Sequence, residues 1–170
     1  MSKKKFKRVL VVLGGTSGER EVSLDSGKAC IKALKKKKYI VSVFDPKNKN
    51  FNLIDKKKTD VIFNALHGKD GEDGVAQSYF EYLKIPYTHS GVVSSYNAMN
   101  KIISKEIFKK NRILTPQYFT LSKCQFSKKV LKNNLNKKGI KFPVVVKPID
   151  EGSSLGVKIS KNINELTKFT

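Results

Sequence analysis

The sequence predicts an α/β fold in two parts, and three observations support this prediction. Over the first 90 residues, short aliphatic and β-branched runs alternate with segments of helical periodicity, which is typical of a parallel sheet covered by helices. Glycine-rich loops follow the first and third apolar runs, where the functional loops of parallel sheets lie. After Ser90-Gly91 the character of the chain changes to a mixed α+β pattern. We therefore expect a boundary near residues 91–97, with domains at 1–94 and 95–170.

The first part is predicted to contain four strands and two helices. The strands are short apolar or extended runs closed by turn residues, at 8–13, 39–44, 60–66 and 85–88. One apolar helical face is read from Ala29, Cys30, Ala33 and Leu34, and the other from Val75, Tyr79, Phe80 and Leu83. Residues 47–58 are polar and irregular, and a short helical turn is expected among them.

The second part is predicted to mix three helices with a hairpin and one further strand. A single helix is expected over residues 95–110, with Lys101 off its apolar face, and it ends before Thr115-Pro116. The next elements are a strand at 117–121 and a helix at 126–136. The hairpin strands at 142–147 and 157–159 then lead to a helix that begins at Ile163.

The loop of this hairpin, Lys147 to Gly156, has the composition of a phosphate-binding turn. Gly152 and Gly156 let the backbone approach a ligand closely, and Ser153 and Ser154 add neutral hydroxyl donors. Lys147 places one compact positive charge at the end of the first strand. Taken alone, this pattern is weak evidence for a nucleotide site.

The formal charge of +21 does not indicate a nucleic-acid-binding protein. The basic residues are almost all lysines in scattered clusters, whereas base readout favours arginine and stacking favours interleaved aromatics. No apolar run approaches the roughly 20 residues of a membrane span. The basic N-terminus is followed by too short an apolar run for a signal peptide. We therefore expect a cytoplasmic protein without nucleic-acid or membrane partners.

The two glycine loops carry the remaining candidate site residues. Glu19, Arg20 and Glu21 lie beside a helix start, where a helix-dipole preference for acids competes with a functional role. His67 follows the third strand, and its residue type fits either a substrate contact or a structural hydrogen bond. The acids of residues 70–73 do not have the spacing of a calcium-binding EF-hand loop, so turn-forming or capping roles are favoured.

Four ordered stretches resemble the motifs of the D-alanine–D-alanine ligase family, whose members have the ATP-grasp fold. They are residues 14–23, residues 65–74, the segments 86–91 and 99–101, and residues 146–156. The resemblance covers essentially the whole chain and departs at Asn100, where many members carry aspartate. It implies a Rossmann-like N-terminal substrate domain, followed by the first, small α+β subdomain of an ATP-grasp fold, truncated at residue 170.

The resemblance implies ATP-dependent ligation of two D-alanines for peptidoglycan precursors. The carboxylate of the first D-alanine is phosphorylated, and the amino group of the second attacks the acyl phosphate. Glu19, which would bind the first ammonium, and Ser153, which would help to position the second substrate, are the implied catalytic and substrate-binding residues. His67 would lie near the first carboxylate.

ATP is the implied cofactor, and five residues match its binding positions in the family. Lys101 and Lys147 would contact the phosphates, which suits their compact charges. Glu151, Gly152 and Ser154 belong to the loop that folds over the nucleotide.

Several parts of the family's site are expected beyond residue 170. These are the rest of the clamp, the ligands of Mg²⁺ (or Mn²⁺), an oxyanion-binding arginine and a tyrosine that partners Glu19 and Ser153. No metal ligand is therefore expected in this chain, which should be inactive alone, and the full-length protein should be a homodimer.

Other functions stay open. A D-alanine–D-lactate ligase or another ATP-grasp carboxylate–amine ligase shares most of these motifs. A polyanion-binding module and a non-catalytic relative of the ligases are weaker alternatives.

Overall fold

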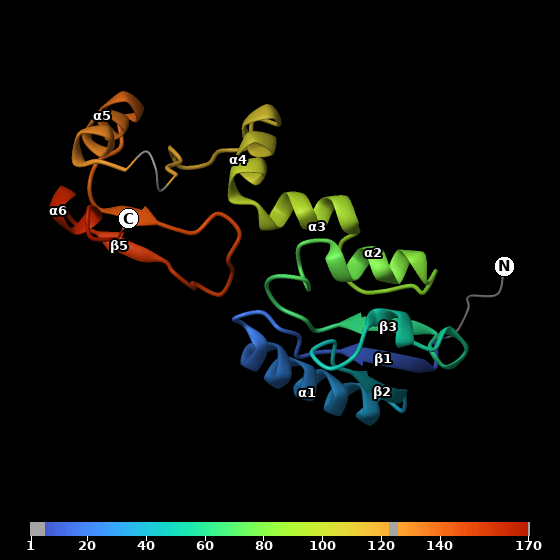
Figure 1. Ribbon diagram of the computed structural model, residues 1–170. Coiled ribbons are helices and arrows are strands. Elements are labelled where there is room, and N and C mark those ends of the chain that lie inside the picture. The colour runs from blue at the N-terminus through green and yellow to red at the C-terminus, as the bar shows by residue number, and fades with distance from the viewer. Residues whose placement is uncertain (1–5, 123–125, 170) are drawn as a thin grey trace. The chain divides into compact units, whose positions relative to one another are not determined.

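The computed structural model describes residues 6–122 and 126–169. The chain divides into two compact units, Met1–Asn100 and Lys101–Thr170 (Figure 1). The basic residues 1–5, which were weighed above against a signal peptide, lie outside the described range. No helix in the described part is long and apolar enough to cross a membrane.

The first unit is built on a parallel sheet, as predicted. Its strands are β1 (Arg8–Val12), β2 (Ile40–Phe44) and β3 (Val61–Asn64), and their order is β2-β1-β3. The expected fourth strand is reduced to one parallel bridge between Ile62 and Tyr87. Because β1 lies between its two neighbours, its carboxyl end opens at the centre of the sheet edge, and the first glycine loop starts there.

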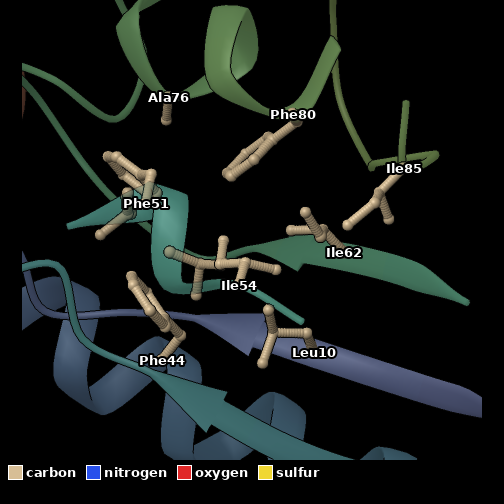
Figure 2. Packing of buried hydrophobic residues seen from close by; sticks show 10 residues of the cluster. Leu10, Phe44, Phe51, Ile54, Ile62, Ala76, Phe80 and Ile85 are labelled. Carbon is tan, nitrogen blue, oxygen red and sulfur yellow. The ribbon is translucent and has the colours of Figure 1, made fainter. Parts of the chain in front are cut away.

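Helices cover both faces of this sheet (Figure 1). On one face α1 (Arg20–Lys36) packs against Val9, Val11 and Leu13. On the other, α2 (Val75–Tyr82) places Phe80 against Leu10 and Ile62 (Figure 2). Successive side chains of a strand point to opposite faces, so the continuous apolar run of β1 supplies both cores.

Residues 47–58 contain two short 3₁₀ turns where one short helical turn was predicted. These are η1 (Phe51–Leu53) and η2 (Lys56–Lys58), each preceded by a side chain that accepts a backbone hydrogen bond. The Phe51 ring stacks on Phe44 and Tyr79, with centroids 5.9 and 5.1 Å apart. Together with the buried Ile54, Phe51 holds this mostly polar segment against the sheet (Figure 2).

The prediction of one helix over residues 95–110 is wrong. The structure has α3 (Val92–Met99) and α4 (Lys101–Lys110), separated by Asn100 in an extended conformation with ψ of 109°. Asparagine favours helix ends because its side chain competes for backbone hydrogen bonds. The break also coincides with the border between the two units.

The second unit contains α5 (Lys128–Lys138), β4 (Val144–Val146), β5 (Lys158–Ser160) and α6 (Ile163–Leu166). β4 and β5 pair antiparallel, which confirms the predicted hairpin. The helices bury Leu131, Leu135 and Leu166 against it. The predicted strand at 117–121 is wrong, since these residues join neither sheet. Their alternating apolar side chains Phe119 and Leu121 instead pack on this core.

Candidate functional site

The first glycine loop is tied to the end of the sheet by a buried serine. The Gly14 N–H donates to Ser23 Oγ at 2.8 Å, and this hydroxyl donates to the Ala65 carbonyl at 2.7 Å. Ser23 is fully buried in α1, so it joins the ends of β1 and β3 through one side chain. Gly14 and Gly15 both have positive φ, which side-chain-bearing residues rarely adopt. The buried Ser23 hydroxyl and the two glycines therefore restrain the backbone of this turn.

An ion pair holds the other side of the loop. Arg20 donates to the Gly15 carbonyl at 2.8 Å and to both carboxylate oxygens of Asp45, at 3.1 and 2.8 Å. Asp45 in turn accepts from the N–H groups of Gly15 and Lys47, each at 3.0 Å. A side chain on Gly14 would collide with this pair, because its Cβ would lie 2.6 Å from Arg20 Nη1. The backbone of the loop is thus fixed from β2 as well as from β3.

Glu19 is buried, although it is a carboxylate. Only 3% of the residue is exposed, and its Oε2 has no hydrogen-bond partner among the residues that the structure describes. It occupies the N-cap position of α1 without making a capping hydrogen bond, so capping does not account for it. Its carboxylate lies against Gly68, where an added Cβ would be 2.4 Å from Oε2. An unpartnered buried carboxylate is costly, which favours a site for a cationic donor.

His67 lies beside Glu19 in the same unit. Ser17 links them, because its hydroxyl donates to the His67 carbonyl at 2.7 Å and accepts from the Glu19 N–H at 3.2 Å. The imidazole Nε2 is 3.1 Å from Ser26 Oγ, and Nδ1 is 3.8 Å from the Glu72 carboxylate. The side chain keeps 30% of its surface exposed. His67 is therefore oriented by its neighbours and still accessible to a ligand.

The acids of the second glycine loop organise the loop itself, as predicted. Glu72 accepts from the Gly68 N–H, and Asp73 accepts from the N–H groups of Asp70 and Val75 at the start of α2. Over the described residues, no group of three metal-ligating side chains could hold a metal ion. These carboxylates are best explained by turn and cap formation.

A cavity of about 300 Å³ opens beside the two loops. Its lining includes Gly14, Gly15 and His67, together with Lys69 from the second loop and Phe51 from η1. The volume lies at the lower end of the range of small-molecule sites, about 300–1,000 Å³. Glu19 is not among the lining residues. The cavity therefore lies against both glycine loops, and Glu19 is buried behind the residues that line it.

In the second unit, the β4–β5 loop forms a long connection with a strained turn. Ser153 and Ser154 are exposed, and both have positive φ, 43° and 62°. Such strain in non-glycine residues clusters at ligand-binding turns. Gly156 meets the other arm of the loop, since a Cβ there would lie 2.7 Å from the Pro148 ring. Lys147 is exposed and makes no hydrogen bond or ion pair with any described residue.

Lys101 is placed differently from Lys147. Its Nζ donates to the carbonyl of Glu151 at 2.5 Å and to that of Ile149 at 3.3 Å. The structure therefore brings Lys101 and Glu151 together, with Gly152 as the next residue of the loop. Of the site residues in this unit, Lys147, Ser153 and Ser154 have their polar groups open to solvent.

Several residues that shape these loops were missed in the sequence. Ser17, Ser23, Ser26 and Asp45 make the hydrogen bonds that orient Glu19, His67 and the first turn. The sequence signals were that Asp45 closes the second strand before a proline and that Ser17 and Ser23 lie in the first motif. Neither signal names the partner, because the contacts join segments far apart in the chain.

The Arg20–Asp45 pair predicts a specific pH dependence of stability. The hydrogen bond from Arg20 lowers the pKa of the Asp45 carboxyl from 3.8 to about 2. Because the folded-state pKa is the lower one, the stabilisation is present above about pH 4 and is lost as the pH falls towards 2. With the carboxylate about one-quarter exposed, Asp45→Asn is expected to lower the free energy of unfolding at pH 7 by about 1–2 kcal/mol.

Urea unfolding of both chains at pH 7, 5, 3.5 and 2.5 checks this result. The difference between Asp45→Asn and the unsubstituted chain should shrink over the two lowest pH values. The exposed Asp25, which pairs with Lys28 on the surface, provides the control Asp25→Asn with no measurable change. A difference that stays constant down to pH 2.5 would contradict the role given to the ion pair.

Comparisons with known proteins agree with the geometry of both units. The family model described as D-ala D-ala ligase N-terminus matches residues 44–90, and the model described as D-ala D-ala ligase C-terminus matches residues 107–170. D-alanine–D-alanine ligase of Pelagibacter ubique is 50% identical over 160 residues, which are 94% of this chain and 52% of the relative. The ligase of Polynucleobacter asymbioticus is 42% identical over 96% of this chain and 47% of the relative.

Solved structures of D-alanine–D-alanine ligases are also similar to this chain. The D-alanine–D-alanine ligase from Bacillus anthracis superposes with a TM-score of 0.79 at 41% identity, over 95% of this chain and 51% of that structure. Its complex with ATP superposes with a TM-score of 0.78 at 39% identity, over 95% and 53%. The chain therefore spans about half the length of the curated relatives that it matches.

Proposed function

Because this chain belongs to the D-alanine–D-alanine ligase family, we propose that it supplies the first-substrate site and the phosphate-covering loop of an ATP-dependent ligase that forms D-alanyl-D-alanine. The observation that carries this proposal is the buried carboxylate of Glu19, whose Oε2 has no hydrogen-bond partner among the described residues. It requires a cationic or hydrogen-bond donor that the described residues do not provide.

The ammonium group of a D-alanine fits this requirement. A carboxylate with little solvent around it forms a strong charge-assisted hydrogen bond with an ammonium. The contact with Gly68 fixes the carboxylate, and the ties through Ser17, Ser23 and Asp45 fix the backbone around it. Binding the amino end in this way would orient the carboxylate of the same D-alanine, with the accessible imidazole of His67 as a contact.

The β4–β5 loop fits the role of a cover for the transferring phosphate. Lys147 and the two serines present an ammonium, hydroxyls and backbone N–H groups that face no partner within the described chain. Such donors neutralise charge on a polyphosphate and, when the loop is ordered, exclude water from an acyl phosphate. We assign Lys147, Gly152 and Ser154 to the nucleotide, together with Lys101 and Glu151, and Ser153 to the second substrate.

In the proposed reaction, each chain residue binds or positions a reactant. Glu19 holds the first ammonium, so the first carboxylate is presented to the γ-phosphate of ATP. Lys147 offsets the charge that develops on the phosphoryl oxygens as the acyl phosphate forms. Ser153 positions the second D-alanine, whose amino group attacks the acyl carbon and releases phosphate. The rate acceleration comes mainly from positioning, because bound reactants are held in a reactive orientation and need not meet by random encounter.

When bound, Mg²⁺ or Mn²⁺ would supply positive charge that offsets the negative charge of the ATP phosphates. Since no cluster of metal-ligating residues occurs over the described range, we assign its ligands to the half of the relatives' length that this chain does not match. The same half would carry the second part of the clamp. We also propose a cytoplasmic location, because ATP and the peptidoglycan precursor are both cytoplasmic. The full-length protein is proposed to be a homodimer, as the family resemblance implies.

A chimaera tests the function. Residues 1–170 are joined to the part of the Pelagibacter ubique ligase that follows its matched 160 residues. We expect the chimaera to release ADP in proportion to D-alanine and to form the dipeptide, because both halves of the site are then present. L-alanine should not replace D-alanine. The chain alone should show no D-alanine-dependent ADP release in the same coupled assay.

Either of two results would count against the proposal. One is a folded chimaera that releases no ADP when D-alanine is added. The other is a chimaera that works equally well with an unrelated amino acid, which would indicate a different carboxylate–amine ligase. Circular dichroism of the chimaera and of the chain serves as the folding control.

A further inference from the structure

Lys101 contacts the β4–β5 loop through both its main chain and its side chain. It is the first residue of α4, and its backbone N–H donates to the Ile149 carbonyl at 3.0 Å. Its side-chain Nζ donates to the same carbonyl at 3.3 Å and to the Glu151 carbonyl at 2.5 Å. Main chain and side chain of one residue thus hold the first arm of the loop.

This arrangement differs from that of a lysine whose ammonium group is left open to a phosphate. Lys147 has such an open ammonium group, because its side chain is exposed and has no partner among the described residues. The ammonium of Lys101 already has carbonyl acceptors, and these belong to the arm that leads into the strained turn at Ser153 and Ser154. An ammonium has three N–H donors, enough to hold two carbonyls and contact a phosphate as well.

The Lys101 hydrogen bonds lie where they can restrain the turn at Ser153 and Ser154. The loop arms meet at Pro148 and Gly156, so the segment between them is held at its base. Between that base and the strained serines, hydrogen bonds from Lys101 reach the loop from another element, the start of α4. Positive φ at two successive non-glycine residues persists only where neighbouring structure restrains it.

We propose that Lys101 is a positioning residue for this loop. It restrains the 149–151 arm by hydrogen bonds to the carbonyl oxygens of Ile149 and Glu151, and it acts on nucleotide affinity through the loop. The restraint itself needs no nucleotide, whereas the effect on affinity rests on the proposed ligase function. A purely direct phosphate ligand would leave the nucleotide-free loop unchanged when it is replaced, so the two roles can be separated.

The test compares Lys101→Met with Lys105→Met in the chain without nucleotide. Lys105 is on the same helix and also binds a distant segment, through Thr115 Oγ1 at 2.6 Å and the Pro116 carbonyl at 3.0 Å. It is a matched control for loss of a helix lysine. The backbone bond of residue 101 survives both substitutions, so only the side-chain contacts are removed.

Hydrogen exchange of the amides at 150–157 is the readout. Lys101→Met should accelerate their exchange about fivefold, as expected for losing a charge-assisted hydrogen bond at a partly exposed site. Lys105→Met should leave it unchanged, and Lys101→Arg should restore part of the protection. Amides of α5 provide an internal folding control, and they should exchange alike in all variants. Unchanged loop exchange in Lys101→Met would overturn the proposal.

A spectroscopic measurement covers the case in which Lys101→Met fails to fold. In the unsubstituted chain at low temperature, the Lys101 ammonium should give a slowly exchanging ¹H–¹⁵N signal, while the free Lys147 ammonium should not. Equal hydrogen-exchange rates of the two ammonium groups would contradict the hydrogen bonds from Lys101 to the loop and would overturn the proposal.

The link to nucleotide is measured in the chimaera. Lys101→Met should raise the KM for ATP at least fivefold and Lys105→Met should not, with Lys101→Arg intermediate in both loop exchange and KM. Changed loop exchange with an unchanged KM would overturn the link to affinity. A chimaera without any ATP-dependent activity would instead count against the proposed function, since the exchange experiment does not use ATP.

Discussion

Glu19→Gln is expected to reduce D-alanine-dependent turnover of the chimaera by ~100-fold or more. The substitution keeps the size of the side chain and removes its charge, so the ammonium of the first D-alanine loses its buried counter-ion. Removing one partner of a buried charge pair costs about 3–5 kcal/mol, which corresponds to this loss of rate when the contact is needed in the transition state. Coupled ADP release over a range of D-alanine concentrations measures it.

Glu21→Gln is the matched control for this substitution. Glu21 lies two residues away on α1 and is exposed, so its replacement should leave turnover unchanged. Glu19→Gln should also raise the melting temperature of the chain alone, because it removes an unpartnered buried charge. Loss of activity together with a lower melting temperature would indicate a structural role for Glu19.

Phe80→Ala is expected to have the largest effect on stability. Phe80 is fully buried in α2 and packs its ring against Phe51 and Tyr87, with centroids 5.7 and 5.4 Å away. Truncating a buried phenylalanine to alanine costs roughly 3–5 kcal/mol, a large part of the stability of a small domain. Urea unfolding, followed by circular dichroism, should show the first unit unfolding at a much lower midpoint.

Tyr82→Ala is the control for the loss of an aromatic ring from the same helix. Its side chain is 77% exposed, so the free energy of unfolding should change by about 0.5 kcal/mol or less. Equal destabilisation by the two substitutions would contradict the packing of α2 on the sheet. A milder variant, Phe80→Leu, should fall between them and keeps the comparison possible if Phe80→Ala does not fold.

The family and the fold class were accessible from the sequence because their signals are local. The apolar run of β1 has both faces buried, so it reads as continuous hydrophobic sequence. Gly14 and Gly15 are required by the positive φ of the turn, and Gly68 by both its φ and the closeness of Glu19. Residues of this kind are identified by their own type and spacing. The roles assigned to Glu19, His67 and the hairpin loop residues stay predictions for the experiments above.

Errors arose where a local pattern had two possible causes. Residues 95–110 have one continuous helical periodicity, but the backbone is extended at Asn100 and two helices form. Phe119 and Leu121 alternate as in a strand, but their side chains are satisfied by packing on α5 and no ladder forms. Periodicity reports which side chains are buried, and it does not report which backbone groups are paired.

By itself, the sequence determined the alternation of strands and helices, the glycine turns and the set of motifs that identifies the family. Only the tertiary structure decided how these parts are held. Arg20 and Asp45 are 25 residues apart, Ser23 and Ala65 are 42 apart, and Lys101 and Glu151 are 50 apart. The strength of such contacts depends on the distance between folded segments and on the water removed from around them. Neither quantity exists until the chain has packed, so no local pattern of residues encodes these partners.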